Sequence, residues 1–146
     1  MEGAMDQRSL YERLGGVAAI TAVVDDFVAR CAADARINSK FARTDIARLK
    51  TMLVDQISEA TGGPARYTGR SMDETHKDMQ VTAGEFDALV EDLVASLNGF
   101  SVPGAEQAEL LGVLGPLRSD IVEVESPTTG ATLPEAYKNA PPLARV

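Results

Sequence analysis

His76 is the residue in this chain best suited to chemistry, and it is the one histidine among 146 residues. Met72 lies four residues before it and Met79 three after it, so all three side chains share one face of a helical segment. Three interpretations compete: a histidine without function, a phosphoryl acceptor on a helical phosphotransfer domain, and an axial ligand of haem iron. A phosphorylated histidine needs water and a nearby cation, whereas the neighbours on this face are methionines and Lys77 points elsewhere. The methionines therefore favour haem ligation.

Other kinds of site have little support in the sequence. The single cysteine, Cys31, stands in no Cys-x-x-Cys pair, and there is no histidine cluster, so zinc and iron–sulfur sites are not expected. The glycine pairs end helices and do not open a phosphate-binding loop. The acidic residues around His76, which are Asp73, Glu74 and Asp78, are explained as a solvated helix face. A hydrolytic enzyme is therefore not predicted.

Charge and composition exclude two classes of partner. The formal net charge is −8 and the sequence pI about 4.6, which argues against binding to nucleic acid or to anionic membranes. No 18-residue apolar segment and no signal peptide is apparent, so the cytoplasm is the default compartment. Hydrophobic residues make up 45% of the chain, as is usual for one globular domain of this length.

The elements that must position His76 are predicted to be helices. Ser9 and Glu12 form a capping-box pattern for a short helix that ends at Gly15–Gly16, and Thr82 with Glu85 repeats that pattern. Thr44 or Asp45 can cap another helix. Apolar residues at helical spacing predict longer helices that include residues 20–31, 49–57, 86–97 and 110–121, the last kinked at Pro116.

These elements divide the chain into three parts. Residues 1–8 are expected to be an N-terminal extension, 9–123 one all-α domain, and 124–146 an extended or disordered tail. The tail holds four of the seven prolines and has no helical pattern. No segment alternates with the period of a strand, so no sheet is predicted.

Taken together, several stretches resemble the group 1 truncated haemoglobins. They are "SLYERLGG", "GGPARYTGR", "M..THKDM" and "FDALVEDLVASL", in this order, and the resemblance runs from about Ser9 to Glu123. It implies a truncated 2-over-2 globin fold, a haem b cofactor and reversible binding of O2, NO or CO.

The resemblance also implies roles for individual residues. His76 matches the proximal iron ligand, and Phe41 the phenylalanine that wedges against haem. Leu49, Met52 and Leu53 fall on the helix that crosses the distal side, which Phe27 and Val28 also border. The other positions implied to contact haem are Met72, Val81, Phe86 and Leu93, with Thr44, Lys50 and Arg70 near the propionates. For the apolar residues, and for Cys31, plain core packing is the alternative.

The distal side departs from the pattern of the family. Many relatives carry a tyrosine at the position of Val28 and a glutamine on the distal helix, where this chain has Leu49 and Leu53. Oxygen bound at haem carries partial negative charge, and an unpaired buried acceptor forfeits about 1–3 kcal/mol. The sequence thus predicts an apolar distal pocket that favours CO or NO over O2.

Two alternatives stay open at this point. Met52 could ligate iron opposite His76, which would make the protein a redox carrier or sensor, although methionine more often fills irregular cores. Outside haem biology, the phosphotransfer domain is the other class. NO dioxygenase-like turnover would need an external reductase as a partner, and a monomer or a weak homodimer is expected.

Overall fold

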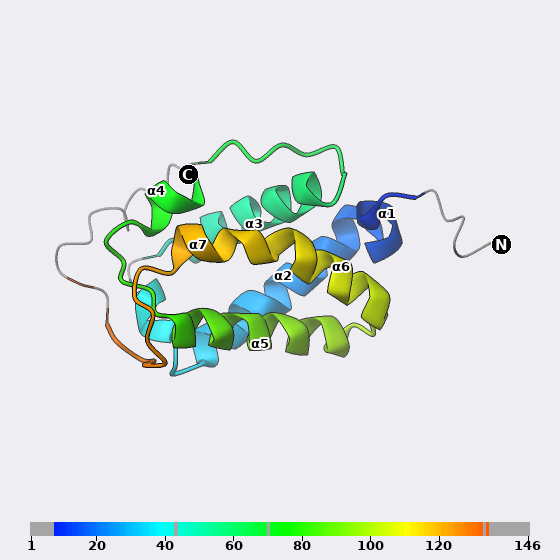
Figure 1. The fold of residues 1–146 in the computed structure, drawn as a ribbon. Coiled ribbons are helices and arrows are strands. Elements are labelled where there is room, and N and C mark those ends of the chain that lie inside the picture. Colours follow the sequence, from blue (N-terminus) through cyan, green and yellow to red (C-terminus); the bar gives the residue numbers. More distant parts are fainter. Residues whose placement is uncertain (1–7, 43, 70, 133, 135–146) are drawn as a thin grey trace.

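The computed structural model describes residues 8–42, 44–69, 71–132 and 134 (Figure 1). Within this part of the chain the regular elements are helical, which confirms the predicted all-α class. They are α1 (Leu10–Leu14), α2 (Gly16–Ala33), the 3₁₀ helix η2 (Asn38–Phe41), α3 (Ile46–Ala60), α4 (Met72–His76), α5 (Ala83–Gly99), α6 (Gly104–Leu114), the 3₁₀ helix η3 (Gly115–Leu117) and α7 (Arg118–Ile121).

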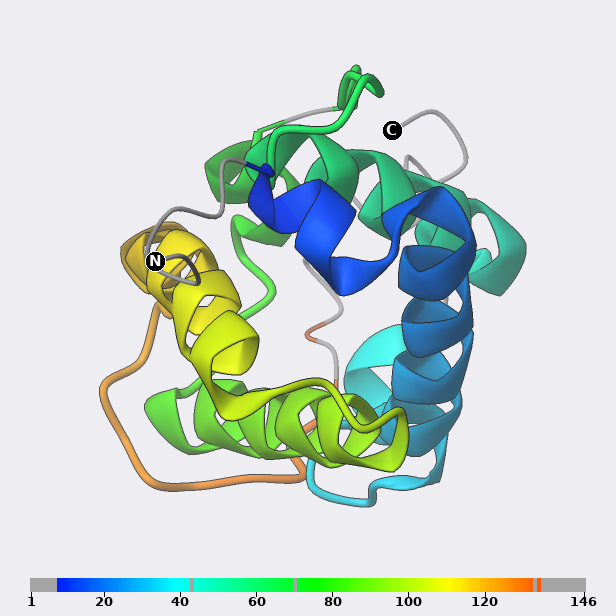
Figure 2. The same cartoon turned by 90° about the vertical axis from the view of Figure 1, so that its right-hand side faces the viewer.

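The long helices surround the interior of the molecule. Helix α2 packs against both α3 and α5, and α1 joins α2 to α6. Figure 2 shows α2, α3, α5 and α6 as the four sides of the molecule, and α4 contacts α7 at one end (Figure 1). The largest fully buried hydrophobic side chains, Val24, Leu97 and Leu110, come from three of these helices. This arrangement agrees with the truncated 2-over-2 globin fold that the resemblance implies.

The predicted capping boxes are present at α1 and α5. Ser9 Oγ accepts the Glu12 N–H at 3.1 Å, and Thr82 Oγ1 accepts the Glu85 N–H at 3.0 Å. Gly15 ends α1 with φ 111°, a left-handed conformation that costs glycine nothing. Short-range sequence signals therefore determine where these two helices begin.

Two further helix starts lie near the candidate site. Asp45, not Thr44, caps α3 by accepting the Arg48 N–H at 3.1 Å. Helix α4 has a capping box of its own, in which Ser71 Oγ accepts the Glu74 N–H at 3.2 Å and the Glu74 side chain returns to the Ser71 N–H. That box fixes the start of the single helical turn that carries His76.

Past α6 the chain bends twice. Pro116 lies in η3, which separates α6 from α7, because proline has no N–H to continue the α-helical ladder. The chain then passes the start of α5, where Val124 O accepts the Ala83 N–H at 2.9 Å and Ser126 O accepts the Gly84 N–H at 3.0 Å. A side chain on Gly84 would collide with the Pro127 carbonyl, so this close approach needs glycine.

The described residues include no helix long and apolar enough to cross a membrane.

Candidate functional site

An apolar cavity of about 350 Å3 lies between α2, α3, α4 and α5. Its volume is within the range of roughly 300–1,000 Å3 that is usual for sites of small molecules and cofactors. Leucine, isoleucine, valine, phenylalanine and methionine supply most of the lining, and the side of α6–α7 closes it with Leu111, Leu114, Leu117 and Ile121. The cavity can hold a flat hydrophobic ligand.

The His76 imidazole lines this cavity with one nitrogen occupied and one free. Its Nδ1 lies 2.8 Å from the Met72 carbonyl oxygen, which can only accept, so Nδ1 carries the proton. The described residues give Nε2 no hydrogen-bond partner. Burial lowers the pKa of His76, against the opposing effects of the Met72 carbonyl and the charge of Glu123. A neutral ring with a fixed tautomer and a free Nε2 is what a metal ligand requires.

The structure brings nearly all the sequence-predicted residues to the same cavity. Those on its lining are Phe27, Val28, Phe41, Thr44, Leu49, Met52, Leu53, Met72, His76, Val81, Phe86 and Leu93.

Lys50, one of the residues assigned to the propionates, does not join them. Lys50 is not on the lining, and its Nζ lies 3.3 Å from Asp25 Oδ1 on α2. Lys50 follows Leu49 directly, and one residue along a helix turns the side chain by about 100°. Arg70 lies outside the described residues. Of the two described members of this set, Thr44 lines the cavity.

The walls formed by α2 and α3 are almost entirely apolar. Val28 is 4% exposed, and Leu49, Met52 and Leu53 line the cavity beside it. Gln56 is the one polar lining residue on these two helices, and it lies two helical turns beyond Leu49. The side chains of Val28, Leu49 and Leu53 thus offer a ligand hydrocarbon and no hydroxyl group.

A buried ion pair at the cavity was not predicted from the sequence. Lys40 of η2 and Glu85 of α5 are 4% and 2% exposed, and Lys40 Nζ lies 3.6 Å from Glu85 Oε1. Oε1 also accepts the Thr82 N–H at 3.0 Å, while Nζ and Oε2 have no hydrogen-bond partner among the described residues. The sequence marked Glu85 as a helix cap, and a cap residue is usually solvated. No sequence pattern near Lys40 or Glu85 indicates that the two residues form an ion pair.

Comparison with known proteins identifies the fold family. The family model described as "Bacterial-like globin" matches residues 9–123. The chain is 34% identical over 118 residues to the group 1 truncated haemoglobin GlbN of Mycolicibacterium paratuberculosis, covering 81% of this chain and 87% of that one. It is 39% identical over 111 residues to the GlbN of Synechocystis sp., with 73% and 90% covered.

A solved structure agrees with these sequence matches. The truncated haemoglobin of Tetrahymena pyriformis in its Fe(III) form superposes with a TM-score of 0.76 at 34% identity, covering 79% of this chain and 98% of that chain. The chain belongs to the bacterial-like globin family and, within it, to the group 1 truncated haemoglobins. It is thus a haem-binding globin that binds diatomic gas.

The residues present fit a haem group. The cavity supplies an apolar enclosure for a macrocycle and one free imidazole nitrogen for its iron. Haem supplies an iron that binds gas in its ferrous state, and the chain supplies the ligand, the enclosure and the exclusion of water.

Proposed function

We propose that haem b occupies the cavity with His76 Nε2 as its proximal ligand, and that a diatomic gas binds on the opposite face, toward α3. One observation carries the proposal: the chain's single histidine lines the cavity with Nδ1 on the Met72 carbonyl and Nε2 free. Burial lowers its pKa, which favours the neutral ring that can offer Nε2 to a metal. Residues 9–123 form the gas-binding domain.

The gas site itself is apolar. Val28, Leu49 and Leu53 line the cavity and carry no hydrogen-bond donor. CO and NO bind without strong need of a donor, whereas bound O2 carries partial negative charge that a donor would stabilise. We therefore infer that the protein releases O2 quickly and holds CO or NO comparatively well.

Replacing Val28 with tyrosine tests the apolar gas site. The phenol can reach bound O2, and one hydrogen bond to a charged acceptor contributes about 1.5 kcal/mol, which corresponds to about a tenfold change in rate. O2 dissociation from the ferrous protein, measured by stopped-flow displacement with CO, is expected to slow about tenfold or more. CO dissociation should change much less.

Val28→Phe is the matched control, because it adds the same ring without the hydroxyl group. Its O2 dissociation should stay close to that of the unsubstituted protein. Equal slowing in both variants would mean that ring volume acts, and not hydrogen bonding. A slow O2 release in the unsubstituted protein would contradict the apolar site directly.

Met52 supports a second candidate function. Its thioether lines the same cavity as His76, and His/Met ligation would favour the ferrous state and suit electron transfer or redox sensing. We expect instead that Met52 fills space, as buried methionines commonly do. Ferric, ferrous and ferrous–CO spectra should show haem loading and CO binding, with no sulfur-to-iron charge-transfer band in the ferric form.

Met52→Ala separates the two candidates. An unchanged ferric spectrum agrees with a five-coordinate or water-ligated iron. A charge-transfer band in the unsubstituted protein that disappears in Met52→Ala would establish thioether ligation and move the function to redox chemistry.

The phosphotransfer alternative has lost its basis. The chain belongs to a globin family, and the His76 ring faces an apolar cavity with Nδ1 occupied. A phosphoryl group there would meet a mainly apolar lining whose lysine, Lys40, already pairs with Glu85. Catalytic turnover of NO would still need an external reductase, which we propose only as a partner class.

A further inference from the structure

The segment after His76 has an unfavourable backbone conformation. Asp78 and Gln80 are not glycines, yet their φ angles are 67° and 57°. Side chains rarely adopt this left-handed region, because Cβ comes too close to the backbone. Two such residues within three positions need an interaction that holds them.

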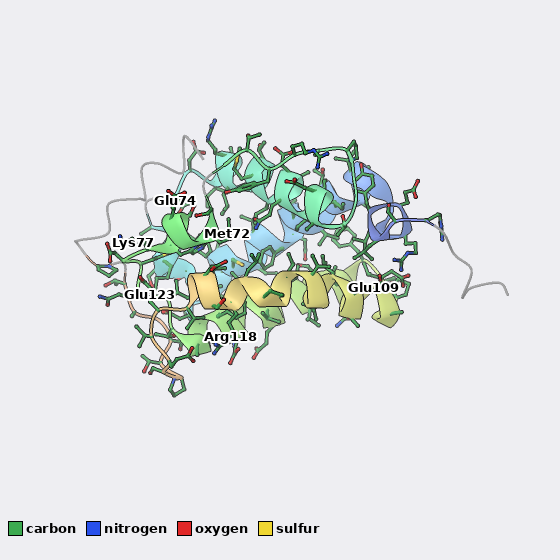
Figure 3. All side chains as sticks on the ribbon, turned by 45° about the horizontal axis from the view of Figure 1, so that its top comes forward. Met72, Glu74, Lys77, Glu109, Arg118 and Glu123 are labelled. Carbon is green, nitrogen blue, oxygen red and sulfur yellow. The ribbon has the colours of Figure 1, made fainter. Side chains whose placement is uncertain are left out.

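The carboxylate of Glu123 supplies that interaction. Its Oε2 accepts the Asp78 N–H at 2.8 Å and its Oε1 accepts the Gln80 N–H at 2.6 Å. Each oxygen thus binds the amide of one left-handed residue, and hydrogen bonds to an ionised acceptor are the stronger kind. In Figure 3, Glu123 lies at the end of α7, beside the segment that begins at Lys77.

The Glu123 backbone is fixed as well. Its N–H donates to the Val81 carbonyl at 2.9 Å, and α7, which ends two residues earlier at Ile121, contacts α4. The Glu123 side chain is exposed, but its backbone is attached to the frame of the molecule and its carboxylate is held by two amides. It can fix the position of the segment that it binds.

That segment is connected directly to His76. The Met79 N–H donates to the His76 carbonyl at 3.1 Å. Met79 is 7% exposed and lines the cavity, as does Val81. Displacement of residues 78–80 would therefore move both the backbone of His76 and the part of the cavity wall that Met79 and Val81 form.

We propose that Glu123 is a positioning residue: it holds the 78–80 segment through two backbone amides and thereby fixes the orientation of the His76 ring toward the iron. This inference rests on the proposed role of His76 as the proximal ligand. It adds a contact made over 45 residues of sequence to the local Met72 contact, so the ring is oriented from both sides of its turn.

Glu123→Gln is the sharpest variant. It keeps the size of the side chain but removes the charge, and its amide nitrogen cannot accept an N–H, so one of the two left-handed amides loses its partner. Glu123→Ala removes both acceptors. Glu125→Gln is the matched control, since Glu125 lies two residues on and pairs with Arg118 at 3.0 Å on the surface.

Amide hydrogen exchange tests the contact itself. In the full-length CO-bound protein, or in the chain without haem if it binds none, exchange at Asp78 or Gln80 should accelerate about tenfold or more in Glu123→Gln and at both in Glu123→Ala. Glu125→Gln should leave both amides unchanged. Unchanged exchange in both Glu123 variants would overturn the proposal whatever His76 does.

Haem measurements then test the positioning role. Loss of haem to an acceptor globin should be about 10-fold faster in the Glu123 variants, the lower end of the range for residues that orient a metal-bound histidine. The iron–histidine band should broaden because the ring is held less firmly, whereas the ferric/ferrous potential should rise from the loss of a nearby negative charge alone. Faster amide exchange with an unchanged iron–histidine band would show a merely structural contact and refute positioning. Failure of His76 to ligate iron would appear separately, as an iron–nitrogen band that does not respond to labelling of histidine.

Discussion

His76→Ala is expected to lose stable haem binding. His76 is the only histidine that the sequence can offer. Its ring lines the cavity and its Nδ1 is taken by the Met72 carbonyl, which leaves Nε2 for the iron. The apolar walls alone would still attract a macrocycle, but without the axial bond. Loss of a partner that merely orients a ligand already costs 10–100-fold, so loss of the ligand should weaken retention by on the order of 100-fold or more. The rate of haem transfer to an acceptor globin measures this loss of retention.

Lys77→Ala is the control for this variant. Lys77 is the next residue and is exposed, so its removal perturbs the same turn without touching the cavity. It should retain haem at the rate of the unsubstituted protein. Full retention by His76→Ala, with an unaltered ferrous spectrum, would show that another group holds the iron.

Lys40→Met is expected to destabilise the fold by about 3–5 kcal/mol, the cost of breaking a buried ion pair from one side. Glu85 would keep its carboxylate at 2% exposure with no cation near it. Methionine retains most of the length of the lysine side chain, so packing changes little. The free energy of unfolding, measured with urea in the same haem state for all variants, gives the effect.

The double variant Lys40→Met/Glu85→Gln removes both charges of the pair and is the comparison for Lys40→Met. Glutamine keeps an oxygen for the Thr82 N–H, the bond that caps α5, but carries no charge. Replacing both members of a buried pair is often neutral, so the double variant should recover most of the loss. A cost below about 1 kcal/mol for Lys40→Met would mean that water reaches the pair and that it acts as a surface salt bridge.

The helices could be predicted because their signals are local. Ser9–Glu12 and Thr82–Glu85 are separated by three residues, so the capping boxes stand in the sequence as written. The turn that carries His76 can be predicted from its apolar face. The capping box of Ser71 and Glu74 at its start is an equally local signal that the predictions from the sequence do not include. Pro116 breaks the last helix as its chemistry requires.

The parts of the site that escaped prediction depend on distant contacts. Lys40 meets Glu85 across 45 positions, and Glu123 meets Asp78 across another 45. Neither pair has a sequence signature. Lysine and glutamate are usually solvated, and only the fold buries Lys40 and Glu85, while Glu123 is exposed and meets a backbone amide that any residue could offer. The apolar lining could be predicted, because helical periodicity marks the inward faces and the resemblance to the family assigns those residues to the haem. The Lys40–Glu85 pair on the same lining could not.

The central claim is that His76 ligates haem iron, and the composition of the chain allows a direct test. Since the chain holds one histidine, growth with 15N-labelled histidine labels His76 alone. Resonance Raman spectra of the ferrous, gas-free protein should contain an iron–nitrogen stretching band that shifts to lower frequency on labelling. A band that does not move, or a ferrous spectrum without one, would contradict the proposed coordination.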